Sequence, residues 1–87
     1  MKVAFHKNFS KQFKKLPIKI QAKVRERIKL FITDPFNVQL NNHSLKGTYL
    51  NYRSINITGD LRAIYKNLED DECIFVVLGT HSQLYYE

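Results

Sequence analysis

The sequence predicts an α+β fold with the element order β-α-α-β-β-β, in which an antiparallel four-stranded sheet carries a helix hairpin on one face. Apolar residues recur three and four positions apart in the first third of the chain, and at every second position or in short runs in the second half. Helices and strands segregated in this way are typical of the α+β class. With 87 residues and only three Gly and two Pro, the chain has room for one compact domain, residues 1–87.

The first third of the sequence is predicted to form a short strand followed by a helix. Lys2 to His6 alternates polar and apolar side chains, with Val3 and Phe5 on the same side, as expected for a strand. Asn8 or Ser10 can then cap a helix. The apolar face of this helix consists of Phe9, Phe13 and Leu16. Pro17 ends it and can begin the next helix.

The second predicted helix runs from Ile18 to about Thr33. Its apolar residues recur at helical spacing, and basic residues fill the other positions. The apolar set is Ile20, Val24, Ile28 and Phe31. Asp34-Pro35 ends the helix, because a proline disfavours the helical conformation in the residue before it. Phe36 to Asn42 is predicted to be irregular.

Three consecutive strands are predicted in the second half. From Tyr49 the period is two, and Ile55 and Ile57 share one face. Turns at residues 58–60 and 69–71 lead into the strands Leu61 to Asn67 and Cys73 to Leu78. Residues 74–78 are apolar throughout, as expected for an inner strand covered on both faces. The tail from Thr80 is predicted to begin with a turn.

These elements suggest how the sheet is assembled. The helix hairpin returns the chain toward its start, so we expect the first two predicted strands to be antiparallel neighbours. The helices would cover one face of the sheet and leave the other partly open. An open face flanked by basic helices could bind RNA or a partner peptide.

The composition favours a cytoplasmic protein with a polyanionic or acidic partner. Lys and Arg number 14 against eight Asp and Glu, a net charge of +6, and the basic residues concentrate in the first third. A solvated basic surface is the alternative interpretation. The single Cys73 excludes an internal disulfide, and no apolar run is long enough to span a bilayer. The N-terminal residues also lack the apolar stretch of a secretion signal.

Four short motifs in the second half combine residue types that can carry chemistry. In chain order they are His43-Ser44-Leu45-Lys46-Gly47, Tyr52-Arg53, Gly59-Asp60-Leu61-Arg62-Ala63-Ile64-Tyr65 and Gly79-Thr80-His81-Ser82-Gln83-Leu84-Tyr85. In this order, and in a chain of this length, they resemble the motifs of RelE/ParE superfamily toxins, in particular those of the YafQ-like branch. Each motif alone is weak, but together they extend the resemblance over the whole chain.

The resemblance implies a toxin of a type II toxin–antitoxin system. It implies the RelE-like fold, a cognate antitoxin that wraps around the toxin, and ribosome-dependent endonucleolytic cleavage of messenger RNA without a metal or other cofactor. We expect an acidic antitoxin, a monomeric free toxin and a hetero-oligomeric complex. Metal-free cleavage requires a base that activates the ribose 2′-hydroxyl, a cation that stabilises charge on phosphorus, and an acid that protonates the leaving 5′-oxygen.

Four residues are predicted to be catalytic. His81 directly follows the buried last strand and matches the family's C-terminal catalytic histidine, and His43 matches the family's histidine before the second strand. Asp60 lies at a predicted hairpin tip, where it could act as a base or orient a histidine. Tyr85 matches the family's late aromatic residue, which could stack on a base or assist proton transfer. A structural role in a cap, a turn or packing is the alternative for each.

Four basic residues are predicted to bind RNA phosphates, namely Arg53, Arg62, Lys46 and Lys66. The two arginines would project from strands, and a guanidinium group can hold a phosphate through two hydrogen bonds at any working pH. Surface salt bridges are the alternative for the arginines.

The sequence also departs from the pattern of the branch. Asn56 and Leu61 stand where YafQ-like toxins tend to carry His and Trp, which leaves the strength of cleavage and the assignment of acid and base open. His6 has no counterpart in the family and is interpreted as structural. Cys73 follows acidic residues, so a reactive thiolate is not expected. We predict no metal site, because the spacing of His and Cys matches no metal-binding motif.

Two other functions are compatible with the same fold. A ParE-like toxin would poison DNA gyrase through protein binding alone, and a catalytically inactive module would bind the antitoxin and repress transcription with it. His43 and His81 at the matching positions favour the nuclease.

Overall fold

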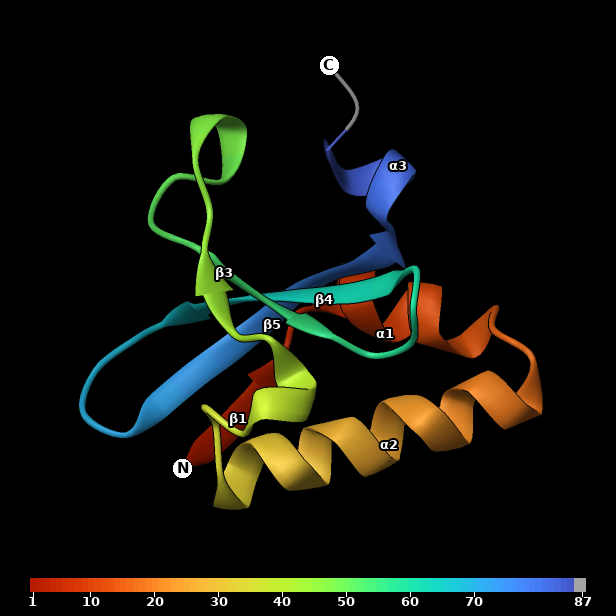
Figure 1. Ribbon diagram of the computed structural model, residues 1–87, viewed down its shortest axis with the longest axis horizontal. Coiled ribbons are helices and arrows are strands. Elements are labelled where there is room, and N and C mark those ends of the chain that lie inside the picture. Colours follow the sequence, from red (N-terminus) through yellow and green to blue (C-terminus); the bar gives the residue numbers. More distant parts are fainter. Residues whose placement is uncertain (86–87) are drawn as a thin grey trace.

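The computed structural model describes residues 1–85, with the backbone alone at residue 85, and confirms the α+β class (Figure 1). The strands are β1 (Lys2–Phe5), β2 (His43–Ser44), β3 (Arg53–Asn56), β4 (Leu61–Asn67) and β5 (Glu72–Thr80). The α-helices are α1 (Lys7–Lys14), α2 (Ile18–Thr33) and α3 (His81–Tyr85), and two short 3-10 helices are η1 (Val38–Leu40) and η2 (Gly47–Tyr49).

The sheet is mixed and five-stranded, in the order β1-β5-β4-β3-β2, which corrects the predicted antiparallel four-stranded arrangement. β1 is not a neighbour of the next strand along the chain; it pairs in parallel with β5, Val3 opposite Cys73 and Phe5 opposite Phe75. The 16 residues of α2 extend about 24 Å, more than the roughly 19 Å between the outermost strands of such a sheet. The helix hairpin therefore returns the chain to the far edge of the sheet, and β2 starts there.

The core lies between the two long helices and one face of the sheet. Phe75 is fully buried at its centre, and its ring centroid lies 5.2 Å from those of both Phe31 and Tyr65. Phe5 and Phe9 extend the aromatic cluster toward β1, with centroids 5.9 and 5.7 Å from that of Phe75. Aromatic contacts of this kind add to the stabilisation from burial, so they fix how the helices sit on the sheet.

The helix ends agree with the sequence except at one cap. α1 begins after His6, whose Nδ1 accepts a hydrogen bond from the backbone N–H of Asn8 at 3.1 Å, so neither Asn8 nor Ser10 is the cap. His6 therefore has a structural role as the N-cap of α1. Pro17 separates α1 from α2, and α2 ends at Thr33 before Asp34-Pro35, as predicted.

We call the sheet face turned away from α1 and α2 the outer face. Register and alternation place on it His43, Ser54, Asn56, Arg62, Ile64, Val77 and Gly79. The loop that contains η2 and the short helix α3 stand on this side, whereas α2 runs along the opposite side (Figure 1). Ile64 is fully buried, so the outer face is open only in part.

A β-bulge bends β5 before it reaches its C-terminal end. Ile64 pairs with Val77 but Tyr65 pairs with Phe75, so one extra residue stands in β5. Just beyond the bulge, the backbone N–H of Leu78 donates to Oε1 of Gln12 at 2.8 Å. The Gln12 side chain of α1 thus anchors the end of β5, just before Gly79 and His81.

Candidate active site

Asp60 and His81 meet where the β3–β4 turn adjoins the end of β5. Leu61 pairs with Thr80, and the backbone N–H of His81 donates to the carbonyl oxygen of Asp60 at 3.0 Å. Both residues are exposed. The pairing of β4 with β5 therefore brings two predicted catalytic residues, 21 positions apart in the sequence, into contact.

Arg62 lies at the same turn. Its Nη1 donates to the carbonyl oxygens of Thr58 and Gly59, at 3.1 Å each, so the guanidinium group is held over the turn that carries Asp60. The side chain is half-buried and starts on the outer face, where Arg62 pairs with Asn56 on one side and Gly79 on the other. Asp60, Arg62 and His81 form what we call the strand-end cluster.

His43 shares the outer face with this cluster. It pairs with Ser54, two residues or about 7 Å along β3 from Asn56, which is opposite Arg62. Nδ1 of His43 lies 2.7 Å from the carbonyl oxygen of Asn41, and a carbonyl only accepts, so Nδ1 carries the proton. In the neutral ring Nε2 then has the lone pair, the state that a general base requires.

Local sequence explains both histidine positions. Asn41 has a left-handed backbone with φ of 46°, a conformation that asparagine tolerates, and this directs its carbonyl at His43. At the other histidine, the N–H of Thr80 donates to Oε1 of Gln83 at 2.9 Å, and the N–H of Gln83 donates to Oγ1 of Thr80 at 3.2 Å. This is a capping box. The pattern Thr80-x-x-Gln83 in the sequence indicates this cap, although only a turn was predicted there.

Gly79 allows α3 to fold back onto β5. A Cβ atom at this position would lie 3.0 Å from Oε1 of Gln83 and 3.2 Å from a methyl group of Leu84. The glycine therefore permits the close packing that, together with the capping box, holds His81 at the first position of α3. The predicted turn after Thr80 is thus a short helix. Tyr85 is its last residue, and its side chain lies outside the described part of the structure.

Asn56 contributes an unusual acceptor beside the cluster. Its Oδ1 is buried and has no hydrogen-bond partner among the residues that the structure describes. Buried acceptors are generally paired, and this one stands on the outer face opposite Arg62. The position at which the YafQ-like branch tends to have His thus carries a group that can accept a hydrogen bond but cannot transfer a proton at neutral pH.

Arg53, also predicted to bind phosphate, is the first residue of β3. It faces the helix side of the sheet, opposite Tyr65, and not the outer face. Its Nε donates to Oδ1 of Asn42 at 2.9 Å, and its guanidinium carbon lies 5.3 Å from the ring centroid of Phe36. Alternation along β3 therefore places Arg53 and Arg62 on opposite faces of the sheet.

The contacts of Arg53 are those of a structural residue. Asn42 also donates to the hydroxyl oxygen of Tyr65 at 2.8 Å. Burial raises the pKa of Tyr65, while the hydrogen bond from Asn42 and the charge of Arg53 act in the lowering direction. The hydroxyl group accordingly stays protonated at neutral pH. Arg53 anchors the segment before β2 to the core.

The two predicted lysines lie away from the strand-end cluster. Lys46 is exposed in the loop before η2. The Lys66 ammonium group lies 5.6 Å from the ring centroid of Tyr52, and Lys66 is four residues or about 13 Å along β4 from Arg62. Both are exposed and can contact a nucleic acid chain beside the cluster.

The other chemically reactive groups do not form a site. Within residues 1–85, no three His, Cys, Asp or Glu side chains gather as a metal would need. Burial raises the pKa of the Cys73 thiol to about 11, so the thiolate that would be a nucleophile is scarce at neutral pH.

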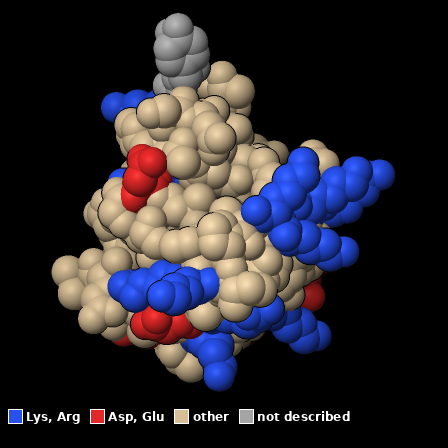
Figure 2. Space-filling model, turned by 90° about the vertical axis from the view of Figure 1, so that its right-hand side faces the viewer, with Lys and Arg blue, Asp and Glu red and all other residues tan. Residues whose placement is uncertain are grey.

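The basic charge lies mainly on the helices. Exposed lysines of α1 and of the turn into α2 include Lys11, Lys14, Lys15 and Lys19. Figure 2 shows Lys and Arg side chains spread over this flank, with few acidic ones between them. A polyanion or an acidic protein approaching this side meets a positive field.

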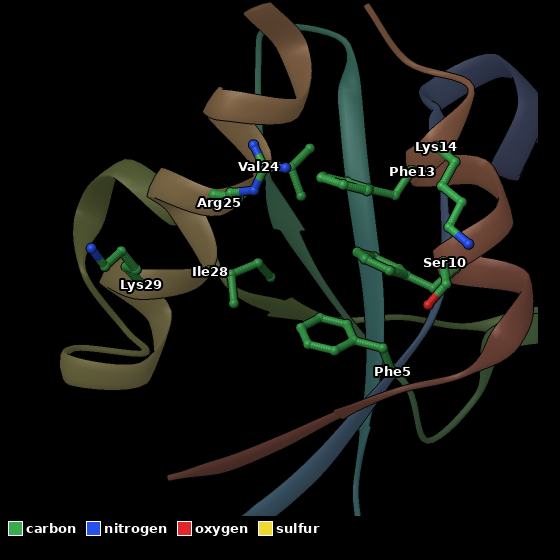
Figure 3. Close-up of a pocket in the computed structure, with 9 residues that line it drawn as sticks. Phe5, Ser10, Phe13, Lys14, Val24, Arg25, Ile28 and Lys29 are labelled. Carbon is green, nitrogen blue, oxygen red and sulfur yellow. The ribbon is translucent and has the colours of Figure 1, made fainter. Parts of the chain in front are cut away.

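A large apolar groove lies between α1 and α2 beside β1, and we call it the helix groove (Figure 3). Its volume is about 560 Å³. The rings of Phe5 and Phe13 point across it toward Val24 and Ile28. Lys14, Arg25 and Lys29 form its rim, and Phe5 remains 45% exposed. The groove is on the helix side of the sheet, so it is separate from the outer face.

Comparison with solved structures first defines the class. The fold is that of the RelE/ParE toxins: the YoeB/ParE toxin from Agrobacterium tumefaciens superposes with a TM-score of 0.77 at 19% identity, covering 93% of this chain and 99% of that chain. YafQ from E. coli strain BL21(DE3) superposes with a TM-score of 0.79 at 25% identity, covering 95% of this chain and 96% of that chain.

The particular family follows from the sequence model of YafQ, a bacterial toxin of a type II toxin–antitoxin system, which matches residues 1–86. The chain belongs to the YafQ toxin family and is a toxin of this type. YafQ in the E. coli DinJ-YafQ toxin-antitoxin complex superposes with a TM-score of 0.70 at 27% identity, covering 95% of this chain and 94% of that chain. No curated protein sequence matches significantly.

None of the helices between residues 1 and 85 combines the length and hydrophobicity of a membrane span.

Proposed function

We propose that this toxin is an endoribonuclease that cuts messenger RNA on the ribosome by metal-free acid–base catalysis. The observation that carries the proposal is the gathering of His81, Asp60 and Arg62 at one end of the outer face, with His43 on the same face and its Nε2 lone pair available. These side chains supply the acid, base and cation that intramolecular cleavage of RNA needs.

The geometry supports a division of roles. His43 takes the proton of the ribose 2′-hydroxyl at Nε2, and the 2′-oxygen forms a bond to phosphorus. Protonated His81 gives a proton to the 5′-oxygen as its bond to phosphorus breaks. Arg62 stabilises the negative charge that develops on the phosphoryl oxygens, and Asp60, whose backbone carbonyl accepts from the N–H of His81, orients that histidine. Tyr85 is proposed to stack on a base of the message.

Asn56 serves a different purpose from a third histidine. Its unpaired Oδ1 can accept a hydrogen bond from Arg62 or from a substrate hydroxyl once RNA is bound. We therefore expect a single acid and a single base, with no reserve proton donor at this position.

Two lines support an antitoxin as the partner. YafQ is bound to DinJ in the solved complex, and this chain has an apolar groove with a basic rim. An amphipathic helix with acidic flanks would bury its apolar side against the phenylalanines of the helix groove and pair its carboxylates with Lys14, Arg25 and Lys29. The antitoxin of this toxin is thus proposed to place such a helix in the groove.

The proposal is tested by incubating the purified chain with ribosomes that are translating a defined message, in buffer with excess chelator, and mapping the ends of the RNA. We expect cuts in the message that require the ribosome and persist with chelator. Intact message together with trapped gyrase–DNA complexes would favour the gyrase-poisoning alternative. Intact message without any gyrase effect would favour the inactive antitoxin-binding module.

A further inference from the structure

A second hollow, separate from the strand-end cluster, lies between the η2 loop, the start of α1 and β5. Its volume is about 290 Å³. Val76 and Val77 of β5 form its apolar floor, and the extra residue of the bulge lies in this stretch. Tyr49 and Tyr52 of the η2 loop and His6 at the start of α1 also line it. The proposed cleavage chemistry uses none of these residues.

The two tyrosines form an aromatic wall. Their ring centroids lie 6.1 Å apart at an angle of 80°, an edge-to-face arrangement, and both side chains are half-buried. The ammonium group of Lys66 lies near the Tyr52 ring, 5.6 Å from its centroid. Aromatic rings beside a cation are the combination with which proteins bind unpaired bases of single-stranded RNA, the ring by stacking and the cation through the phosphate.

Three polar residues that line the hollow supply hydrogen-bonding groups. Nδ1 of His6 accepts from the N–H of Asn8, so the neutral ring carries its proton on Nε2, which is a donor. The Asn8 amide and the Thr48 hydroxyl, which also line the hollow, can donate and accept. An apolar floor, an aromatic wall and a polar edge match the faces and the edge of a nucleobase.

We propose that this hollow is a nucleobase-binding subsite, which takes one unstacked base of the message that flanks the cut. The inference rests on the proposed nuclease function and adds a residue-level source of sequence preference. Val77 precedes His81 by four residues, about 13 Å along β5, so the bound base belongs to a flanking nucleotide and not to the phosphate being cleaved. Tyr52 supplies stacking, and His6 with Asn8 contacts the base edge.

The test compares cleavage patterns on ribosomes programmed with messages that vary in every base around the cut. Tyr52→Leu should reduce cleavage at preferred sites about tenfold and flatten the preference at one flanking position. Tyr52→Phe keeps the ring and should retain both. His6→Asn preserves a good helix cap and should change which base is preferred. Phe36→Leu, which removes an exposed ring on the helix side of the sheet, is the matched control and should change neither.

A second measurement separates this proposal from the nuclease function. The free chain is titrated with AMP, CMP, GMP and UMP while the ring resonances of His6 and Tyr52 are followed by NMR. We expect shifts for at least one mononucleotide, and their loss in Tyr52→Leu. Absence of shifts together with an unchanged pattern in Tyr52→Leu would overturn the subsite even if the wild-type chain cleaves. Shifts without cleavage by the wild-type chain would support the subsite and reject the nuclease.

Discussion

At the scale of single residues, the alternation of side chains along a strand decides which groups can act together. Arg53 and Arg62 both come from paired strands, but one points toward Asn42 and Phe36 and the other toward the β3–β4 turn. The first is part of a partly buried hydrogen-bond network, and the second lies at the turn that carries Asp60. Charge alone does not distinguish them, whereas the face of the sheet does.

His81→Ala should reduce cleavage by about 10²- to 10⁴-fold, because general acid catalysis by one side chain contributes that much. His81 is exposed, and its backbone N–H still binds Asp60 in the variant, so the melting temperature should hardly change. Single-turnover cleavage and thermal unfolding measure the two effects. Ser82→Ala, at the next exposed position, is the control; equal losses in both variants would show that the effect comes from α3 and not from the imidazole.

The two arginines give a matched pair of variants. Arg62→Ala should slow cleavage with little loss of stability, and Arg62→Lys should restore only part of the rate because the planar fork is lost. Arg53→Ala should do the reverse. It should lower the free energy of unfolding by about 1–3 kcal/mol, because Asn42 loses a charged donor, and leave the cleavage rate of the folded protein unchanged. Denaturant titration measures the free energy of unfolding, and cleavage assays measure the rate. Loss of both quantities in both variants would contradict the assignment.

At the scale of elements, α3 is a five-residue helix that depends on its cap to position His81. Gln83→Ala removes the acceptor for the N–H of Thr80, and loss of such a cap costs about 0.5–2 kcal/mol locally. We expect this local fraying to reduce cleavage about tenfold, while the free energy of global unfolding stays nearly unchanged. Gln83→Glu should rescue the rate, since glutamate also closes a capping box. Hydrogen exchange at Thr80 reports the cap directly, and unchanged exchange in Gln83→Ala would contradict the role.

Most elements could be predicted from local sequence, because periodicity and proline fix them locally. Pro17 and Asp34-Pro35 bound α2, and the alternation at Ile55 and Ile57 marks the strand region around β3. The partner of β1 could not be predicted. Val3 and Phe5 suit any sheet edge, and their pairing with β5 depends on how far α2 carries the chain. The two-residue strand β2 is likewise too short to leave a periodic signal.

The candidate site was predictable in its residue types but not in its geometry. The motif around His81 gave the residue, yet the contact with Asp60 arises from the register of β4 against β5. The tautomer of His43 depends on the left-handed backbone of Asn41, and no sequence pattern indicated that conformation. The helix groove was also missed, because the residues that line it had been interpreted as core. These residues pack against the core at the floor of the groove and leave the space above that floor open.

At the scale of the whole molecule, catalysis and partner binding are assigned to opposite sides of the sheet. The outer face carries the strand-end cluster, and the helix groove lies between α1 and α2 on the other side. Affinity for an antitoxin and inhibition of cleavage can therefore be separated. If a helix in the groove holds the partner, as proposed, inhibition of cleavage requires a further segment of the antitoxin that reaches the outer face.

Reversing the charges of Lys14 and Lys29 together should weaken antitoxin binding at least tenfold, because two favourable rim contacts become repulsive. Cleavage by the free variant should not change. Lys2→Glu with Lys19→Glu alters the net charge equally at exposed positions outside the groove and serves as the control. Titration calorimetry measures the affinity. Equal weakening by both pairs would mean that net charge alone attracts the partner and that the helix groove is not its site.

The most direct test of cleavage through the 2′-hydroxyl uses a message in which the ribose on the 5′ side of the cut is replaced by deoxyribose. Our account attributes cleavage to attack by the 2′-hydroxyl, which stands beside phosphorus and gains the rate advantage of an intramolecular reaction. The substituted message should bind and remain uncut, whereas the unmodified message should give a 2′,3′-cyclic phosphate, or its hydrolysed 3′-phosphate, and a 5′-hydroxyl in excess chelator. Efficient cutting of the deoxyribose message would contradict the mechanism.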